Sequence, residues 1–350
     1  MTSKRIGLVV VAGLRFLACG EDGTNPVGAV DHTTGVANPA YQGVNLDISG
    51  RPSPADFDAL VDAGVNWIAL VPFGWQPRFD TPEVQLRTSG VRWSETDAGL
   101  REIAASARER GISVMLKPHI WLRQEVPGEW RGTIRFDRDE DWQLWESAYH
   151  ALILHYAQLA ADEEIELFSV GVELNSSIRA RPAFWRQLID DVRQVFPGRV
   201  TYGANWFEEF KEVSFWDLVD VIGVHAYFPL TNRSDATVEQ LVTGWQQHVG
   251  DIRALCLTHD KPVAFLEVGY RSVSGAAIEP WRYDEEKPDD ATEQAESYEA
   301  LFRTFWHEPW FDGLFMWKWN VGAGDRDRYS PQGKPAETVL REWFLGERPA

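Results

Sequence analysis

Cysteine is scarce in this sequence, and an excess of positive charge is missing altogether. Two cysteines in 350 residues cannot supply a disulfide scaffold or a four-thiolate zinc site. The 34 lysines and arginines are outnumbered by 53 aspartates and glutamates, which gives a net charge of −19. Because so acidic a chain repels phosphate backbones and anionic lipids, we expect no nucleic-acid partner.

Tryptophan, in contrast, is abundant, with 17 copies. The indole ring is large, flat and amphipathic, so the excess indicates either sugar-stacking surfaces or a bulky core. Four of these residues recur at helical spacing and are predicted to lie in the core: Trp142, Trp145, Trp185 and Trp306. The second cysteine, Cys256, lies in a predicted helix and is also expected to be buried.

The N-terminal residues 1–19 resemble an export segment. Two basic residues precede a mostly apolar run that is too short to span a bilayer, and small residues then precede Cys19. This pattern resembles a bacterial lipoprotein cleavage box, in which Cys19 would be lipidated. A plain secretory signal, or a cytosolic chain with an apolar start, stays open because an arginine interrupts the run. Residues 20–40 are rich in Gly, Thr and Asn and read as a flexible tether.

From residue 41 onward, short apolar runs alternate with amphipathic stretches. The apolar runs predict buried parallel strands at 43–48, 66–73, 112–117, 165–172, 200–204, 219–226, 262–268 and 313–317. Helices are predicted at 54–63, 139–160, 238–257, 292–306 and 337–344, and from Pro182. A further helix is expected after a capping box formed by Ser94 and Asp97.

Eight strands that alternate with helices predict a single (β/α)8 barrel over residues 41–350. The alternative is a doubly wound open sheet, which is disfavoured because no Gly-x-Gly-x-x-Gly turn follows any strand. Connections after several strands are long, at 72–93, 118–138, 269–291 and 320–335. Long loops on one side of a barrel mark its functional face, at the C-terminal ends of the strands.

Two carboxylates stand out at that face. Glu173 and Glu267 each end an apolar run, where a carboxylate is costly unless it is paired or catalytic. They follow the fourth and seventh predicted strands, which face each other across an eight-stranded barrel. A retaining glycosidase needs two carboxyl groups about 5–5.5 Å apart. Structural glutamates paired with Arg or Lys are the alternative, and an inverting geometry stays open.

Polar and aromatic residues surround these glutamates at the predicted strand ends. Tyr227 is placed to hydrogen-bond Glu267, with a rim aromatic as the alternative. The candidates for sugar hydroxyls, each equally consistent with a structural role, are Asn45, Lys117, His119, Asn205 and His225. The candidate stacking platforms, some of which are expected to be core residues, are Trp75, Trp121, Trp206, Trp281, Trp317 and Trp319.

Several of these segments together resemble glycoside hydrolase family 113, a family of β-mannanase-like barrels. The matching segments are 169–174 (SVGVEL), 202–206 (YGANW), 215–217 (FWD), 220–229 (DVIGVHAYFP), 265–272 (FLEVGYRS) and 280–281 (PW). The resemblance implies that Glu173 is the acid/base and Glu267 the nucleophile of a retaining enzyme. It also implies a β-1,4-mannan or manno-oligosaccharide substrate, and neither a metal nor another cofactor.

One residue departs from the wider clan to which that family belongs. Much of the clan carries Asn directly before the acid/base glutamate, where it holds the sugar 2-hydroxyl, whereas this chain has Val172. Asn205 is our candidate for that role. Because the stereochemistry at C2 separates mannose from glucose, the sugar specificity stays open. We further expect the nearby charge of Glu267 to raise the pKa of Glu173, as a general acid requires.

Three other classes of function are alternatives to a glycosidase. A metal-dependent hydrolase would need clustered histidines at strand ends, but the 8 histidines are scattered. An aldolase using Lys117 as a Schiff base would need no paired glutamates. A non-catalytic glycan-binding lipoprotein would bind sugar without turnover. The expected partner is a neutral β-linked polysaccharide or oligosaccharide, bound by an exported monomer whose only membrane contact is a lipid on Cys19.

Overall fold

The computed structural model describes residues 38–87, 89–124, 126–322 and 327–348. The predicted export segment 1–19, with its candidate lipidation site Cys19, lies outside the described residues, as does most of the tether. Among the helices that are described, none combines the length and the apolar character that crossing a membrane requires.

Within these residues, eight parallel strands close into a barrel in which neighbours in the chain are neighbours in space. In order around the barrel they are β1 (Tyr41–Ile48), β2 (Trp67–Leu70), β5 (Ser113–Leu116), β7 (Leu167–Val172), β8 (Arg199–Asn205), β9 (Val221–His225), β10 (Val263–Val268) and β11 (Phe311–Val321). β11 pairs with β1 and completes the ring. The predicted (β/α)8 fold is therefore confirmed.

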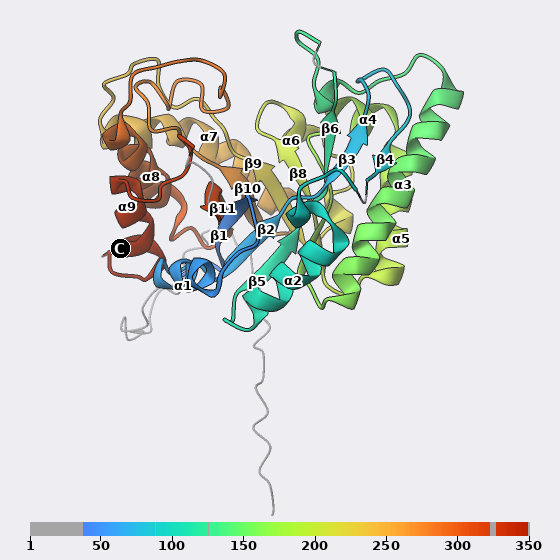
Figure 1. The fold of residues 1–350 in the computed structure, drawn as a ribbon. Coiled ribbons are helices and arrows are strands. Elements are labelled where there is room, and N and C mark those ends of the chain that lie inside the picture. Colours follow the sequence, from blue (N-terminus) through green and yellow to red (C-terminus); the bar gives the residue numbers. More distant parts are fainter. Residues whose placement is uncertain (1–37, 88, 125, 323–326, 349–350) are drawn as a thin grey trace, which may run out of the picture.

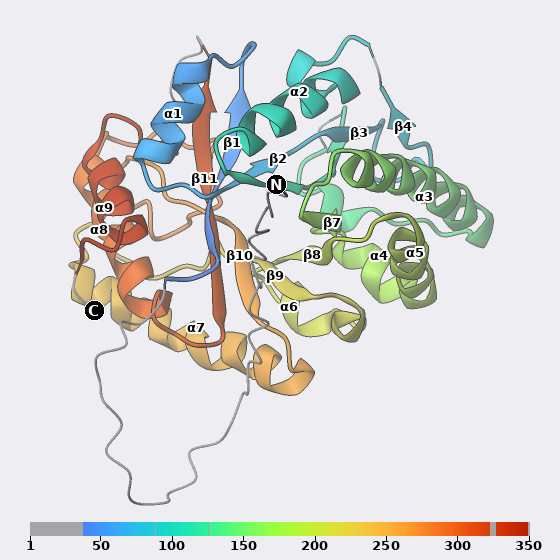
Figure 2. The same cartoon turned by 90° about the horizontal axis from the view of Figure 1, so that it is seen from below.

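Helices surround the strands, with α3 and α5 along one side and α8 and α9 along the other (Figures 1 and 2). The helices are α1 (Pro54–Asp62), α2 (Asp97–Arg108), α3 (Asp139–Asp162), α4 (Asn175–Ala180), α5 (Pro182–Val195), α6 (Glu209–Glu212), α7 (Val238–His259), α8 (Ala291–Phe305) and α9 (Pro335–Phe344). The predicted N-cap of α2 is wrong: Thr96, not Ser94, accepts the N–H of Gly99 at 3.2 Å.

The second predicted strand, 66–73, is in fact split between two sheets. Its first part is the barrel strand β2, and Pro72 then interrupts the ladder because proline lacks an N–H donor. The chain continues as β3 (Phe73–Gln76), which forms a small sheet with β6 (His119–Leu122) and β4 (Gln85–Leu86). This sheet extends past the barrel at the ends of β2 and β5 and brings aromatic residues to the cleft described below.

The hydrophobic core lies mainly between the strands and the helices, and a smaller cluster is formed by strand residues such as Leu167, Ala264 and Phe315. The four tryptophans expected in the core are buried, with Trp145 and Trp185 fully inaccessible. Cys256 is buried as well. The prediction that these four tryptophans pack in the core is therefore confirmed.

Candidate active site

A cleft of about 1690 Å³ lies over the C-terminal ends of the strands, on the face where the long loops were predicted. Its lining includes residues that end or directly follow β7, β8 and β9, namely Glu173, Asn205 and Tyr227, together with Glu267 of β10. The loops after β2, β5, β10 and β11 also contribute lining residues. Both predicted catalytic glutamates therefore face one shared cleft.

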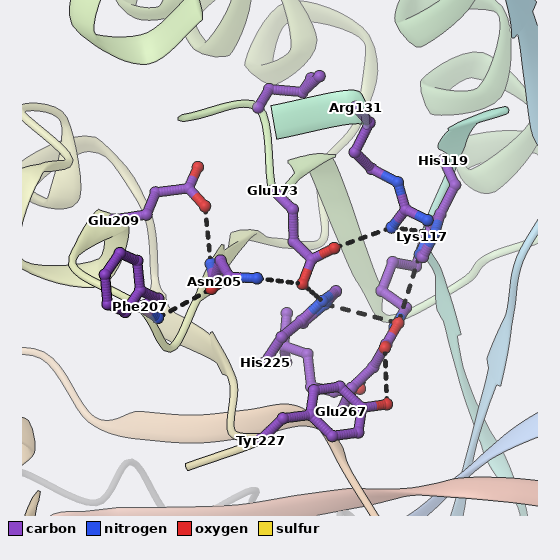
Figure 3. Close-up of polar contacts among 12 residues, drawn as sticks. Lys117, His119, Arg131, Glu173, Asn205, Phe207, Glu209, His225, Tyr227 and Glu267 are labelled. Carbon is purple, nitrogen blue, oxygen red and sulfur yellow. Dashed lines mark hydrogen bonds and ion pairs between the residues drawn. The ribbon is translucent and has the colours of Figure 1, made fainter. Parts of the chain in front are cut away.

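Donor groups converge on the Glu267 carboxylate at the floor of this cleft (Figure 3). Lys117 Nζ donates to Oε1 at 2.5 Å, and the Tyr227 hydroxyl donates to Oε2 at 3.1 Å. His119 Nε2 and His225 Nε2 lie 3.5 and 3.7 Å from Oε1. The predicted hydrogen bond from Tyr227 is confirmed, and both carboxylate oxygens are held in fixed directions.

The backbone at Glu173 adopts a conformation that is uncommon for a residue with a side chain. Its φ is +51°, in the left-handed region, which costs about 1–3 kcal/mol and persists only where the surroundings hold it. Here the N–H of Glu173 donates to the Gly203 carbonyl at 2.8 Å, and the N–H of Leu174 donates to the Tyr202 hydroxyl at 2.8 Å. Hydrogen bonds on both sides of the turn thus fix the direction of the Glu173 side chain.

The Glu173 carboxylate is bound by side chains from two other elements. Its Oε2 accepts from Arg131 Nη1 at 2.9 Å, in the loop after β6, and its Oε1 accepts from Asn205 Nδ2 at 2.9 Å, at the end of β8. Asn205 is itself held, because its Oδ1 accepts from the N–H of Phe207 at 2.8 Å. Glu173 is therefore fixed by one charged and one neutral donor.

One imidazole separates the two glutamates. His225 Nδ1 lies 3.2 Å from Glu173 Oε1 and its Nε2 lies 3.7 Å from Glu267 Oε1, although neither nitrogen has hydrogen-bond geometry toward a described residue. The fully buried ring fits because residue 203 is glycine: a Cβ there would lie 2.6 Å from Nε2. The distance between the two carboxylates is therefore at most the width of one imidazole ring plus one contact on each side.

The electrostatics of Glu173 differ from the sequence-based expectation. Burial raises the pKa of this carboxyl, but His225, Arg131 and the hydrogen bond from Asn205 together outweigh burial and lower the pKa. The prediction that the pKa of Glu173 is raised is therefore wrong. The groups that lower it come from other elements, and no strand pattern in the sequence reveals them.

Lys117 lies below the cleft and pairs with Glu267 out of contact with solvent. Its Nζ also donates to the Leu266 carbonyl at 3.3 Å and lies 5.8 Å from the centre of the Trp317 ring. Burial lowers the pKa of Lys117, and the Glu267 charge opposes that shift. A buried ion pair of this kind leaves a costly uncompensated charge when one partner is removed.

Lys117→Met is accordingly expected to lower the free energy of unfolding by about 3–5 kcal/mol, because Glu267 then keeps a buried carboxylate without its cation. Denaturant titration of the purified variant measures this change. Lys211→Met is the matched control, since Lys211 is half exposed and pairs with Asp251 at the surface. Its expected change is within about 0.5 kcal/mol. Equal stability of the two variants would contradict the structural importance of the buried pair.

Aromatic residues line the cleft on two sides. On one side lies an aromatic surface, called the β3–β6 wall, which is formed by Phe73 and Trp75 of β3 and Trp121 of β6. The ring centroids of Phe73 and Trp121 are 5.4 Å apart. On the other side, Trp206 and Trp281 form a stacked pair with centroids 4.9 Å apart and planes at 28°. Trp121 and Trp281 are 47% and 38% exposed, so each has ring surface available to a ligand.

The structure places some predicted substrate-binding residues in the cleft and others away from it. The predicted residues that line the cleft are Trp75, His119, Trp121, Asn205, Trp206, Trp281 and Trp317. Four others are buried and do not line it: Asn45, Lys117, His225 and Trp319. Asn45 donates to the Leu266 carbonyl at 3.0 Å within the barrel, and Trp319 packs in the hydrophobic core. The structure therefore favours the structural alternative for these four residues, and sugar contact by them stays a prediction.

Two residues of the site carry no obvious signal in the sequence. Arg131 lies in a loop after β6, and only its position in a long connection at the strand C-termini hinted at a role. Glu209, four residues after β8 ends, is fully buried and hydrogen-bonded next to Asn205. For Glu209, the one hint of burial in the sequence was its position between the aromatic residues Phe207 and Phe210.

Comparison with known proteins identifies a family and solved structures that resemble this chain over most of its length. The model of glycoside hydrolase family 113 matches residues 40–333. The β-mannanase AaManA of Alicyclobacillus acidocaldarius, solved in complex with ManMIm, is 30% identical with a TM-score of 0.77, over 89% of this chain and 98% of that one. Two structures described as GH113 β-1,4-mannanase, one of them a complex, are 27% and 28% identical with TM-scores of 0.76, over 88% of this chain and 99% of theirs. No curated protein matched the chain.

Proposed function

The chain belongs to glycoside hydrolase family 113, and from this premise we propose that it cleaves β-1,4-mannosidic linkages in mannan, glucomannan or manno-oligosaccharides with retention of configuration. The observation that carries the proposal is the pair of buried glutamates, Glu173 and Glu267, on either side of the His225 ring in an aromatic cleft. The solved relatives are described as β-mannanases, which supports mannose as the sugar.

In the proposed mechanism, Glu267 attacks the anomeric carbon and forms a glycosyl ester. Lys117 and Tyr227 hold its two oxygens, so the attacking group needs no reorientation before it reacts. Glu173 protonates the departing glycosidic oxygen in the first step. In the second step Glu173 takes a proton from water, which then hydrolyses the ester and restores Glu267.

Sugar binding is assigned to the aromatic sides of the cleft and to Asn205. The β3–β6 wall and the Trp206–Trp281 pair offer flat apolar faces, which suit the C–H faces of pyranose rings. The amide nitrogen of Asn205 carries two protons, of which one is donated to Glu173. The second has no acceptor among the described residues, so it can bond a sugar hydroxyl, and we retain Asn205 as the candidate partner of the 2-hydroxyl.

A substrate panel tests the proposal directly. Residues 38–350 are purified and incubated with mannan, glucomannan, cellulose and manno-oligosaccharides, and new reducing ends are measured. Proton NMR of the first product to form then gives its anomeric configuration. We expect turnover of the mannosyl substrates and an initial β-anomer. Binding of mannan without turnover would instead favour a glycan-binding protein, and an initial α-anomer would favour inversion.

The contact between Arg131 and Glu173 predicts a specific pH effect. The general acid must carry a proton, whereas the Arg131 guanidinium favours the ionised form of Glu173 and contributes to its lowered pKa. Arg131→Gln removes this cation and is expected to raise the pKa of Glu173. Since activity is lost as pH rises through that pKa, the alkaline limb of kcat/KM on mannotetraose should move upward by about one pH unit.

The matched control for this variant is Arg135→Gln. Arg135 lies in the same connection between β6 and α3 but pairs with Glu129 at 2.9 Å, at the surface. Its alkaline limb should coincide with that of the unaltered chain. Both variants keep the other titratable groups near Glu173 and Arg131, namely Lys117, His119, Glu209, His225, Tyr227 and Glu267. A limb that does not move in Arg131→Gln would therefore remove Arg131 from the control of Glu173.

A further inference from the structure

Glu209 is a carboxylate in a place where burial makes a charge expensive. It begins α6, is fully inaccessible to solvent, and forms no ion pair among the described residues. Burial raises its pKa to about 8, against the hydrogen bonds from Tyr202 and Asn205. A buried acid without a cation is usually selected against unless its hydrogen bonds serve a purpose.

The first hydrogen-bonded connection from Glu209 reaches the backbone that follows Glu173. Tyr202 on β8 donates its hydroxyl proton to Glu209 Oε1 at 2.6 Å. The same hydroxyl oxygen accepts the N–H of Leu174 at 2.8 Å, directly after Glu173. Glu209 thereby orients the hydroxyl that supports the left-handed turn at Glu173.

The second connection reaches the Glu173 carboxylate itself. Glu209 Oε2 accepts the backbone N–H of Asn205 at 2.8 Å, and the side chain of Asn205 donates to Glu173 Oε1 at 2.9 Å. Figure 3 shows Glu209, Asn205 and Glu173 in one line of contacts. One carboxyl group therefore holds Glu173 from two directions, through its backbone and through its side chain.

We propose that Glu209 is a positioning residue of the reaction, which holds Glu173 in line with the glycosidic oxygen through Tyr202 and Asn205. This inference rests on the proposed function, because it assigns Glu209 to the proton-transfer step of glycoside cleavage. A small displacement of a proton donor slows the transfer steeply, since general-acid catalysis depends on reach and alignment. The competing explanation is that Glu209 merely closes the turn between β8 and α6.

The two explanations differ in how the loss of activity depends on the leaving group. Glu209→Gln places an amide nitrogen against the Tyr202 hydroxyl or the Asn205 N–H, so one connection is broken while the volume is kept. We expect kcat/KM on mannotetraose to fall about 10–100-fold. On a dinitrophenyl β-mannoside, whose leaving group needs no proton, kcat/KM should change less than about threefold. A role limited to closing the turn would lower both values by the same factor.

Two further variants complete the experiment. Tyr202→Phe removes the hydroxyl that links Glu209 to Leu174 and leaves the link through Asn205 in place. It should show the same leaving-group selectivity with a smaller loss, so it decides the matter if Glu209→Gln does not fold. Glu212→Gln is the matched control on the same helix, since Glu212 pairs with Arg179 at the surface and should leave both rates unchanged. Circular dichroism and thermal melting verify the fold of each variant.

The outcomes separate this inference from the function on which it rests. Equal losses on the two substrates, or no loss on either, would overturn the role of Glu209 while leaving mannoside cleavage intact. If the unaltered chain cleaves neither substrate, the proposed function itself fails, and the inference fails with it. A selective loss on mannotetraose in both Glu209→Gln and Tyr202→Phe is the result that supports it.

Discussion

Glu267→Gln is expected to lower kcat/KM on mannan by at least about 10⁴-fold, because an amide cannot attack the anomeric carbon and form the glycosyl ester. The substitution keeps the size of the side chain, and its one amide oxygen can still accept from Lys117, which bonds Oε1, or from Tyr227, which bonds Oε2. Because the change also removes the charge that balances Lys117, denaturant titration of the variant verifies its fold before the loss of activity is assigned to the missing nucleophile. Release of reducing ends at saturating and subsaturating mannan measures the effect.

Two additional measurements make this test specific. Glu286→Gln is the control, because Glu286 also lines the cleft but is exposed and pairs with Arg328 at 3.4 Å. Its activity should stay within about threefold of the unaltered chain. A 2-fluoro-mannosyl fluoride, which slows hydrolysis of the ester, should add one sugar to the peptide that contains Glu267. An adduct on another residue, or near-normal turnover by Glu267→Gln, would contradict the assignment.

The sequence predicts the architecture of this chain well, because the barrel is specified by repeated local patterns. Buried parallel strands read as short apolar runs, and their alternation with amphipathic helices leaves few other folds. Glu173 and Glu267 were recognisable for a related reason: each carboxylate ends an apolar run, where it is conspicuous. Their convergence on one cleft then follows from the geometry of the barrel. Their chemical roles stay predictions.

The errors arise where a residue's place depends on neighbours that are distant in the chain. Pro72 divides a continuous apolar run between two sheets, and the second sheet is recognisable only once β6 is seen beside β3. Trp317 and Trp319 are two residues apart near the end of β11, yet one lines the cleft and the other packs in the core. Side-chain alternation alone does not decide this, since β11 is irregular where it pairs with β1.

The same limit explains the mistaken electrostatics of Glu173. The sequence places Glu267 opposite Glu173, and a like charge alone would raise the pKa. Arg131 reaches Glu173 from a loop with no periodic pattern, and His225 enters between the glutamates because Gly203 leaves room. Both contacts are long-range and oppose the predicted direction. A lowered pKa in the site is a property of the assembled fold.

The role of Glu173 predicts a second large effect, which depends on the leaving group. Glu173→Ala is expected to lower kcat/KM on mannotetraose by about 10³-fold or more, because the departing sugar oxygen then leaves without a proton. With a dinitrophenyl β-mannoside, kcat/KM should fall less than about tenfold, since that leaving group is stable as an anion. Similar losses on the two substrates would argue against Glu173 as the general acid.

Added azide distinguishes the two glutamates by stereochemistry. In Glu173→Ala the mannosyl ester on Glu267 still forms, and azide entering the space of the missing carboxylate attacks it without needing a base. The expected product is the β-mannosyl azide, with faster turnover of the dinitrophenyl substrate. In Glu267→Ala azide instead takes the place of the nucleophile and attacks the substrate directly, so the α-mannosyl azide is expected. Because the assigned roles place the two carboxylates on opposite faces of the sugar ring, the two variants should give opposite anomers. The same anomer from both would contradict those roles.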